Sequence, residues 1–430
     1  MQKKVLILTY YWPPSGGSGV QRWVYFAKYL KRLGVDPIIL TVDPNKASFP
    51  SEDKSLLEET KGVKVIHTNS FEPLQLYSKL ITGNKKKGVP YGSVPTSRQS
   101  PFKKAAAFIR GNMVLPDARK YWKRYAIAAG RKLLSNEKID VMISTGPPHS
   151  THLIAQQLKN EFHLPWIADF RDPWTEIFYN KDLYRTSFAK KRDAKMEATV
   201  LNQADAVLAI SPGTANLLTS KMKVPSKIHC ILNGYDHEQF KGIKKIKHTD
   251  FFVISYVGYL GKHHQYNVFI NGLKLLVKTL KDKKIKLHLA GNIEPLIYRQ
   301  LEKIEGITIQ HEGQVSHQRA LTIISSAHLL FISIPNSEYA MGNIPGKLLE
   351  YTATGNPIIL AGEKESNAAE IVGEFSNTTV VSDDEAEIFA DFSLKVASGE
   401  IRRNNNLEVT YKYTREATTK RLFNLINQIS

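Results

Sequence analysis

The chain has 430 residues, of which 42% are hydrophobic and 23% charged, and it carries a formal net charge of +19. This length predicts two domains rather than a single core. The single cysteine excludes a disulfide framework and favours a reducing compartment. The sequence contains no run of 18 apolar residues, so no transmembrane helix is predicted. No cluster of Cys or His residues has the spacing of a metal site.

The chain opens with the pattern of a βαβ unit. Near-continuous apolar runs at 4–10 and 37–42 are typical of strands covered on both faces, and the first run starts too early for a signal peptide. Between the two runs, Gly16, Gly17 and Gly19 precede a helix. Glycine-rich turns at this place often bind phosphates or other ligands, so we predict a ligand loop, with a plain tight turn as the alternative.

A nicotinamide-dependent dehydrogenase would also carry a glycine loop here, and it would carry an acid at the end of the second strand, where Asp43 stands. The spacing argues against a dehydrogenase. Five residues, 11–15, separate the strand from the loop, and the glycine pattern is G-G-x-G instead of G-x-G-x-x-G.

The positive charge is concentrated between residues 79 and 132, where 14 Lys and Arg residues stand against one acid, Asp117. Helical spacing of apolar residues predicts two amphipathic helices in this window, one over 102–113 and one that follows a cap at Asp117 and contains Trp122 and Leu133. Cations beside aromatic side chains suit an anionic membrane surface, and no recognisable nucleic-acid module accompanies them. A solvated face over an ordinary core helix is the alternative for either helix.

Two motifs of the first domain follow predicted strands. One strand leads to His149 and a helix, and the run 165–168 leads to residues 169–174, which read Asp-Phe-Arg-Asp-Pro-Trp. Because open α/β sheets bind ligands at the carboxyl ends of their strands, Arg171 and Asp172 are candidates for a functional site. A buried structural pairing of arginine with aspartate is the alternative.

The strand pattern restarts after a lysine-rich linker at 241–248. A strand over 251–257 ends in a loop that contains Lys262. Further strands are predicted at 286–290, 307–310, 329–334 and 357–360. This alternation indicates a first doubly wound α/β domain at 1–240 and a second at 250–406.

The most informative stretch is 341–362. Gly342 and Asn343 fall in a loop, Pro345 suits the first turn of a helix, and Gly355 suits its end. An apolar run that fits a buried strand follows.

On this helix, Lys347 and Glu350 are three residues apart and share one face. A helix N-terminus with a lysine in its first turn suits a phosphate, and a carboxylate one turn later can accept hydrogen bonds from both hydroxyls of a ribose. The alternative is a surface helix whose lysine and glutamate are merely solvated.

Residues 341–362 resemble the donor-binding segment of retaining GT-B glycosyltransferases of the family-4 type. Residues 169–174 resemble a motif of members that act on polysaccharide intermediates, and residues 233–240, which contain N-G-x-D and a later Phe, resemble the end of the family's first domain. The resemblance covers nearly the whole chain. It implies an α/β GT-B fold, in which two doubly wound Rossmann-like domains face each other across a cleft and the last helix, about 407–430, packs back on the first domain.

The resemblance implies a hexosyltransferase that moves a sugar from a UDP-, GDP- or dTDP-linked donor to a glycan or lipid-linked acceptor. It further implies retention at the anomeric carbon, no metal or other cofactor, and a place in bacterial polysaccharide synthesis. With an anionic membrane surface as partner and no nucleic acid, we expect a cytoplasmic protein, peripheral on the inner face of the membrane. A GT-B sugar-nucleotide epimerase, a nicotinamide-dependent dehydrogenase and a non-catalytic basic membrane-surface protein remain the alternatives.

Carried over residue by residue, the resemblance implies that Lys347 stabilises the leaving diphosphate and that Glu350 holds the ribose. Asp172 and Arg171 are the other catalytic candidates, and His149 would lie on the acceptor side. Donor contacts are also expected from Gly342, Asn343, Lys262, Gly16, Gly17 and Gly19.

The chain departs from the family pattern in the second domain. Tyr259 and His264 stand where an arginine and a lysine often bind the pyrophosphate, which leaves Lys262 to substitute for them. Gly342 stands where the first glutamate of the family's E-x7-E is expected, so Glu338 or a backbone contact would have to replace it.

Overall fold

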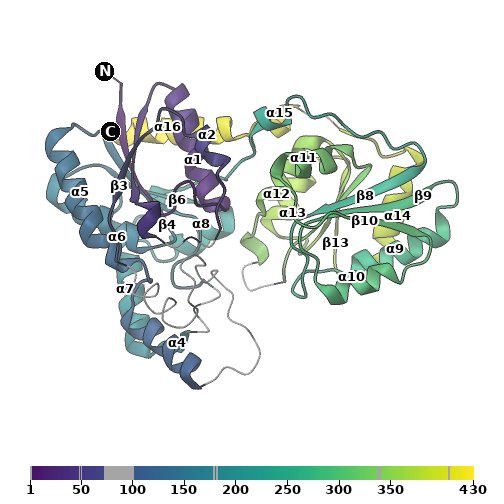
Figure 1. The fold of residues 1–430 in the computed structure, drawn as a ribbon, viewed down its shortest axis with the longest axis horizontal. Coiled ribbons are helices and arrows are strands. Elements are labelled where there is room, and N and C mark those ends of the chain that lie inside the picture. The colour runs from purple at the N-terminus through teal and green to yellow at the C-terminus, as the bar shows by residue number, and fades with distance from the viewer. Residues whose placement is uncertain are drawn as a thin grey trace. The chain divides into compact units, whose positions relative to one another are not determined.

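The structure is a computed structural model that describes residues 2–47, 49, 51–71, 101–177, 180, 183–336, 340–404 and 407–430 (Figure 1). Glu338 and the part of the basic window before residue 101 lie outside the described residues. The chain divides into two compact units, the first made of Met1–Asn233 with Thr418–Ser430, and the second of Gly234–Ala417.

The first unit is built on a seven-stranded parallel sheet of order β3-β2-β1-β4-β5-β6-β7. Its strands are β1 (Lys4–Leu8), β2 (Asp36–Val42), β3 (Lys64–Thr68), β4 (Val141–Gly146), β5 (Trp166–Phe170), β6 (Ala206–Ala209) and β7 (Ile228–Cys230). Its helices are α1 (Ser18–Arg32), α2 (Leu56–Glu59), α4 (Pro101–Met113), α5 (Lys123–Asn136), α6 (Ser150–Phe162), α7 (Ser187–Gln203), α8 (Pro212–Thr219) and most of α16 (Arg415–Ile429). The strand order reverses between β1 and β4, and ligands of such sheets bind at the carboxyl ends of the strands beside the reversal.

The second unit is built on a six-stranded parallel sheet of order β10-β9-β8-β11-β12-β13. Its strands are β8 (Phe251–Val257), β9 (Lys284–Ala290), β10 (Ile307–His311), β11 (Leu329–Ser333), β12 (Ile358–Ala361) and β13 (Thr378–Val381). Its helices are α9 (Asn267–Thr279), α10 (Pro295–Glu302), α11 (His317–Ser326), α12 (Gly346–Thr354), α13 (Asn367–Gly373), α14 (Ala386–Ser398) and α15 (Leu407–Tyr411). Here the order reverses between β8 and β11. The prediction of two doubly wound Rossmann-like domains is confirmed (Figure 1).

Each sheet is covered by helices and has its own hydrophobic core. The central strands are largely apolar because both faces are buried, as in β1, where residues 5–8 are fully inaccessible. Strand β13 was not predicted from the sequence, since its four residues include two threonines and give no apolar run.

The division between the units lies at Asn233 and Gly234, earlier than the expected end at residue 240. Backbone pairing explains the difference. The Tyr235 N–H donates to the Tyr413 carbonyl at 3.0 Å, and the Arg415 N–H donates to the Tyr235 carbonyl at 2.8 Å. The return to the first unit begins at Thr418, not at 407, and three apolar residues of α16 then join the first core: Leu422, Leu425 and Ile426.

The two predicted amphipathic helices of the basic window differ in the structure. In α5 and the turn before it, Trp122, Ala126 and Leu133 are buried in the first core, so the ordinary core-helix alternative holds there. In α4, by contrast, Ile109 and Met113 are exposed.

Asp117 was expected to cap the helix that follows it, and that expectation is wrong. Its carboxylate accepts from the Ser150 N–H at 2.8 Å and from the Ser150 hydroxyl at 2.9 Å, so it caps α6. It also closes its own turn on the Arg119 N–H at 2.8 Å. The acid thus joins the basic window to the loop that carries His149.

Candidate functional site

The glycine loop and Arg171 meet at the strand-order reversal of the first sheet. The Arg171 backbone N–H and Nε donate to the Gly146 carbonyl at 3.0 and 3.2 Å, and Nη2 donates to the Pro147 carbonyl. A Cβ on Gly19 would lie 1.7 Å from Nη1 of Arg171. Glycine at this position therefore leaves the space that the guanidinium occupies beside the start of α1.

The other two glycines of the loop have different surroundings. The Gly16 N–H donates to the Ser51 carbonyl at 2.9 Å, and Gly17 caps α1 with a φ of 103°, which favours glycine. Among the three glycines of this loop, Gly19 is thus the one whose Cβ position meets a predicted catalytic residue.

Asp169 and Asp172 stand three residues apart in very different environments. The Asp169 carboxylate is fully buried and pairs with Arg22 at 2.9 Å. It also accepts from the Trp23 indole at 2.7 Å and the Thr145 hydroxyl at 2.8 Å. Buried arginine–aspartate pairing therefore exists here, but it joins Arg22 to Asp169 and leaves Arg171 out.

The Asp172 side chain, by contrast, is exposed and has no hydrogen bond or ion pair among the described residues. The dense protein around it raises the pKa of the Asp172 carboxyl, and the nearby Arg171 charge opposes that rise. A carboxylate without a partner beside a buried guanidinium is available to a ligand.

His149 lies in an aromatic cluster at the end of β4. It is buried and stacks on Trp174 with ring centroids 4.8 Å apart and an interplanar angle of 8°. His152 stacks on Phe170 at 4.6 Å. Burial keeps the pKa of His149 well below its usual range, and burial lowers the pKa of His152 to about 3, so both rings are neutral at pH 7.

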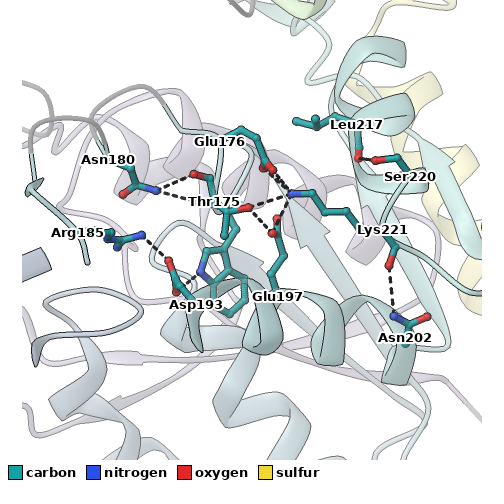
Figure 2. A network of polar contacts seen from close by, with 11 residues as sticks. Thr175, Glu176, Asn180, Arg185, Asp193, Glu197, Asn202, Leu217, Ser220 and Lys221 are labelled. Atoms are coloured by element: carbon teal, nitrogen blue, oxygen red, sulfur yellow. Dashed lines mark hydrogen bonds and ion pairs between the residues drawn. The ribbon is translucent and has the colours of Figure 1, made fainter. Parts of the chain in front are cut away.

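Sequence reasoning missed the network that holds the segment after Asp172, which Figure 2 shows. The Trp174 indole donates to Asp193 at 2.8 Å, and the Thr175 hydroxyl donates to Glu197 at 2.5 Å. The Lys221 ammonium, just beyond α8, binds Glu176 at 2.5 Å and Glu197 at 2.9 Å.

The two carboxylates of this network come from α7. Asp193 and Glu197 lie one turn apart and are buried on the same face as Ala189 and Leu201. That pattern was the available signal, because acids that recur with the apolar face of a helix need buried partners.

Lys347 lies at the strand-order reversal of the second sheet, in the first turn of α12. Its ammonium donates to the Tyr256 hydroxyl at 2.9 Å and lies 4.1 Å from the centroid of the same ring. No carboxylate pairs with it among the described residues. Burial lowers the pKa of Lys347 to about 7.

A glycine makes the space for this lysine. Gly258 follows β8 with a φ of 125°, and a Cβ there would lie 3.1 Å from the Lys347 ammonium. The helix itself follows the sequence prediction, since Pro345 precedes its first residue and Gly355 ends it in the left-handed conformation with a φ of 70°.

Glu350 lies one turn after Lys347, and its Oε1 is 2.9 Å from Nε2 of His317. His317 is the first residue of α11 and was not predicted as a site residue. Of the two loop residues expected at the donor, Gly342 ends a short turn of 3-10 helix (Ala340–Gly342) and Asn343 follows it.

The loop after β8 carries the positions that depart from the family pattern. Tyr259 is exposed, and burial lowers the pKa of His264 to about 4, an effect that the Lys347 charge reinforces. His264 is therefore neutral at pH 7 and cannot replace the missing cation. The Lys262 side chain is exposed, and its backbone N–H donates to Glu294 at 2.6 Å.

A polar cavity of about 530 Å³ opens beside this loop, at the carboxyl ends of strands β8, β11, β12 and β13. It is lined by Lys262, His263, His264, Gln265, Tyr266, Asn267, Asn336, Glu363, Ser382 and Asp383. Across the described residues, no three His, Cys, Asp or Glu side chains gather where they could hold a metal ion. Within the same residues, no helix combines the length and apolarity that crossing a membrane requires.

Two family models match the sequence. The model described as Glycosyltransferase Family 4 matches residues 17–239, and the model described as Glycosyl transferases group 1 matches residues 252–398. Among curated protein sequences, none gives a significant match.

Solved structures similar to this chain include a glycosyltransferase from Rickettsia africae, with a TM-score of 0.63, 14% identity, and coverage of 100% of this chain and 98% of that chain. Anabaena HepE in complex with UDP and glucose has a TM-score of 0.58 and 12% identity, with coverage of 99% of this chain and 100% of that chain. The lipopolysaccharide outer core galactosyltransferase WaaB has a TM-score of 0.59 and 14% identity, with 99% of each chain covered. At such identities the likeness shows the fold alone, and that fold is the predicted GT-B class.

Proposed function

The chain belongs to glycosyltransferase family 4, and from that premise we propose that it transfers a hexosyl group from a nucleotide-sugar donor to a glycan or lipid-linked acceptor. The transfer proceeds with retention at the anomeric carbon and without a metal ion. Both features are proposed from the family resemblance of residues 341–362.

The observation that carries the proposal is the state of Lys347. Among the described residues, this half-buried ammonium contacts a tyrosine ring and no carboxylate, so its charge is available to an anionic ligand. It lies at the start of α12, where backbone N–H groups and the helix dipole also favour negative charge. A diphosphate supplies that charge, and its negative charge grows as the bond to the sugar breaks, so Lys347 stabilises the transition state more than the bound donor.

Other residues of each domain take complementary roles in this proposal. In the second domain, Glu350 binds the ribose hydroxyls, and its hydrogen bond to His317 orients the carboxylate for that contact. In the first domain, Asp172, which has no partner among the described residues, and the buried Arg171 act on the sugar or the acceptor. The neutral His149 contacts the acceptor.

HepE, which was solved in complex with UDP and glucose, suggests a UDP-linked sugar as the first candidate here, followed by GDP- and dTDP-linked sugars. The likeness to WaaB, a lipopolysaccharide outer core galactosyltransferase, supports a glycan or lipid-linked acceptor made by bacteria. Such an acceptor is reached from a peripheral position on the inner face of the cytoplasmic membrane, which is where we propose that the enzyme works.

A panel of UDP-, GDP- and dTDP-linked sugars tested by thermal shift identifies the donor. A ligand at 100 times its Kd stabilises its domain by about 2.7 kcal/mol. For a unit of this size that raises Tm by roughly 5–10 °C. Absence of a shift with every sugar nucleotide would contradict the proposal.

Three further measurements test the finer claims. The anomeric proton coupling of the product, read by NMR, distinguishes retention from inversion. Turnover that survives EDTA supports metal independence. Incubation with donor alone separates a transferase from an epimerase, since an epimerase releases a changed free sugar without any acceptor.

A further inference from the structure

Five large apolar side chains are exposed where α4 meets the segment that leads into α7. On α4, Phe108, Ile109 and Met113 are 47%, 52% and 71% exposed. On the α7 side, Tyr184 and Phe188 are 48% and 74% exposed. Single exposed apolar residues are ordinary, but a group of them marks an interaction surface.

Close packing makes these two segments one surface. A Cβ on Gly111 of α4 would lie 2.2 Å from the Leu183 carbonyl oxygen, so the glycine permits the approach. The Asn112 side chain accepts from the Thr186 N–H and hydroxyl, both at 2.7 Å, and donates to the Tyr184 carbonyl at 3.2 Å. Figure 1 shows α4 lying beside the beginning of α7.

In these segments the acidic side chains are engaged within the first unit, whereas cationic side chains are exposed on the outer face. The described acids of residues 101–125 and 183–197 are Asp117, Asp193 and Glu197, and all three are engaged in hydrogen bonds within the first unit. The outward cations are Lys104, Lys190, Lys191, Arg192 and Lys195, each exposed and without an ion pair among the described residues. The outer face is therefore apolar and cationic, with no acid from these described residues.

A further cation joins the group. The Lys120 ammonium donates to the Met113 carbonyl at 2.6 Å, and Arg192 lies close enough to add to the burial that lowers the Lys120 pKa. Positive charge thus gathers around the exposed end of α4, where like charges repel unless a polyanion is present.

We propose that this face, the α4–α7 surface, inserts its apolar side chains into an anionic lipid bilayer. The surface consists of Phe108, Ile109, Met113, Tyr184 and Phe188 with the cations Lys104, Lys120, Lys190, Lys191, Arg192 and Lys195. Cations alone would serve nucleic acid equally well. Exposed Met and Phe side chains among the cations are what an interfacial membrane segment has and a phosphate-backbone site does not need.

Helix α7 joins this surface to the candidate site. Its outer face carries Phe188 and the exposed cations, while Asp193 and Glu197 on its inner face hold Trp174 and Thr175, just after Asp172. Bilayer contact at the outer face would bring lipid-linked substrates to the domain that carries Asp172. This role in substrate delivery rests on the proposed function, but binding of the protein to the bilayer is measured without any transfer reaction.

The test is flotation of the full chain with vesicles of phosphatidylglycerol and phosphatidylcholine, and with vesicles of phosphatidylcholine alone. We compare an apolar variant, Met113→Gln with Phe188→Gln, and a charge variant, Lys190→Glu with Lys191→Glu. The matched controls lie in the second unit: Leu296→Gln, which removes an exposed apolar side chain, and Lys274→Glu with Lys278→Glu, which reverses two exposed cations.

We expect the parent to bind the anionic vesicles and both surface variants to bind them about tenfold more weakly or worse. Each cation near the surface contributes on the order of a fivefold affinity factor, and burying a Met or Phe side chain contributes about as much or more. The controls should keep the parent affinity. Phe188→Trp provides a second readout, since its fluorescence should shift to the blue with anionic vesicles only.

Parent binding that the surface variants leave unchanged would overturn the proposal, as would equal binding to neutral vesicles or displacement of the vesicles by double-stranded DNA. Sugar-nucleotide binding, followed by calorimetry in the same variants, keeps this failure apart from failure of the proposed function. It should be unchanged in every variant.

Discussion

The shifted pKa of Lys347 predicts that donor binding takes up a proton. Burial lowers this pKa to about 7, and among the described residues the ammonium contacts the Tyr256 hydroxyl and no carboxylate. A bound diphosphate favours the charged form and raises the pKa again. The donor diphosphate is esterified at both ends and keeps a constant charge, so the proton must come from solvent to the protein.

The magnitude follows from the free-state pKa. At pH 8 a group with a pKa of about 7 is roughly 90% neutral, so binding should take up about 0.9 proton; at pH 6 it should take up about 0.1. The affinity for the donor should therefore fall as pH rises above 7. The fall approaches tenfold per pH unit until the Lys347 pKa of the bound state is reached. Calorimetry of donor binding in two buffers with different ionisation enthalpies gives the proton count at each pH.

Neighbouring groups must be separated from Lys347 in this experiment. Tyr256 has a pKa raised well above its usual value, and His264 has one lowered to about 4, so neither titrates between pH 6 and 9. His317 and Glu350 form the other polar pair on the adjoining helices. Lys347→Arg keeps all of these and stays charged throughout, so its donor affinity should not fall with pH above 7.

Equal proton uptake by the parent and by Lys347→Arg would refute this reasoning, because the proton would then belong to another group. Lys347→Met should lose the uptake together with turnover. A Met variant with a raised KM and intact turnover would make Lys347 a binding residue only.

Three further predictions concern single side chains. Asp172→Asn should keep Tm within about 1 °C and lose transfer, since the carboxylate has no partner among the described residues. Asp169→Asn, by contrast, should lose about 3–5 kcal/mol of stability in a urea titration, because it leaves a buried arginine without its partner. A destabilised Asp172→Asn would make Asp172 structural. Glu350→Ala should weaken donor binding by roughly 1.5–3 kcal/mol, which is more than His317→Ala should weaken it. If calorimetry gives equal losses for the two variants, the role of Glu350 is only to bind His317. Gly19→Ala should displace Arg171 and lower the transfer rate by up to about 100-fold, at a stability cost on the order of 1 kcal/mol. The control Gly373→Ala places its Cβ in open space and should change neither the transfer rate nor the stability. An active Gly19→Ala would contradict the role of Arg171.

The parts of the fold that were predictable are those with a local signal. Apolar runs predicted β1, β2 and β5 in the first sheet and five of the six strands in the second, because a strand buried on both faces has no polar alternation to obscure it. Pro345 and Gly355 likewise marked the limits of α12, since their backbone preferences act within one turn. Strand β13, with only four residues and two threonines, has neither signal.

The site was predictable only in outline, because its partners are far apart in sequence. Nothing near residue 347 indicates that Tyr256 will accept from its ammonium, 91 positions away. Asp117 looked like a local cap and instead holds Ser150, 33 positions later. Sequence spacing reports neighbours on one helix or strand, whereas these contacts depend on which strand ends the topology brings together.

The two aspartates at the end of β5 show how the fold decides what identical side chains do. Asp169 lies near the end of the buried strand β5. Its negative charge is stable there only because Arg22, Trp23 and Thr145 supply hydrogen bonds from α1 and β4. Those same contacts satisfy the carboxylate and leave it no capacity for a ligand. Asp172 follows the strand end, where no described partner reaches it, so its acceptor capacity remains for whatever binds at the carboxyl edge of the sheet. The buried acid thus fixes α1 and its glycine loop against β5, and the free acid is held in place by that fixed frame.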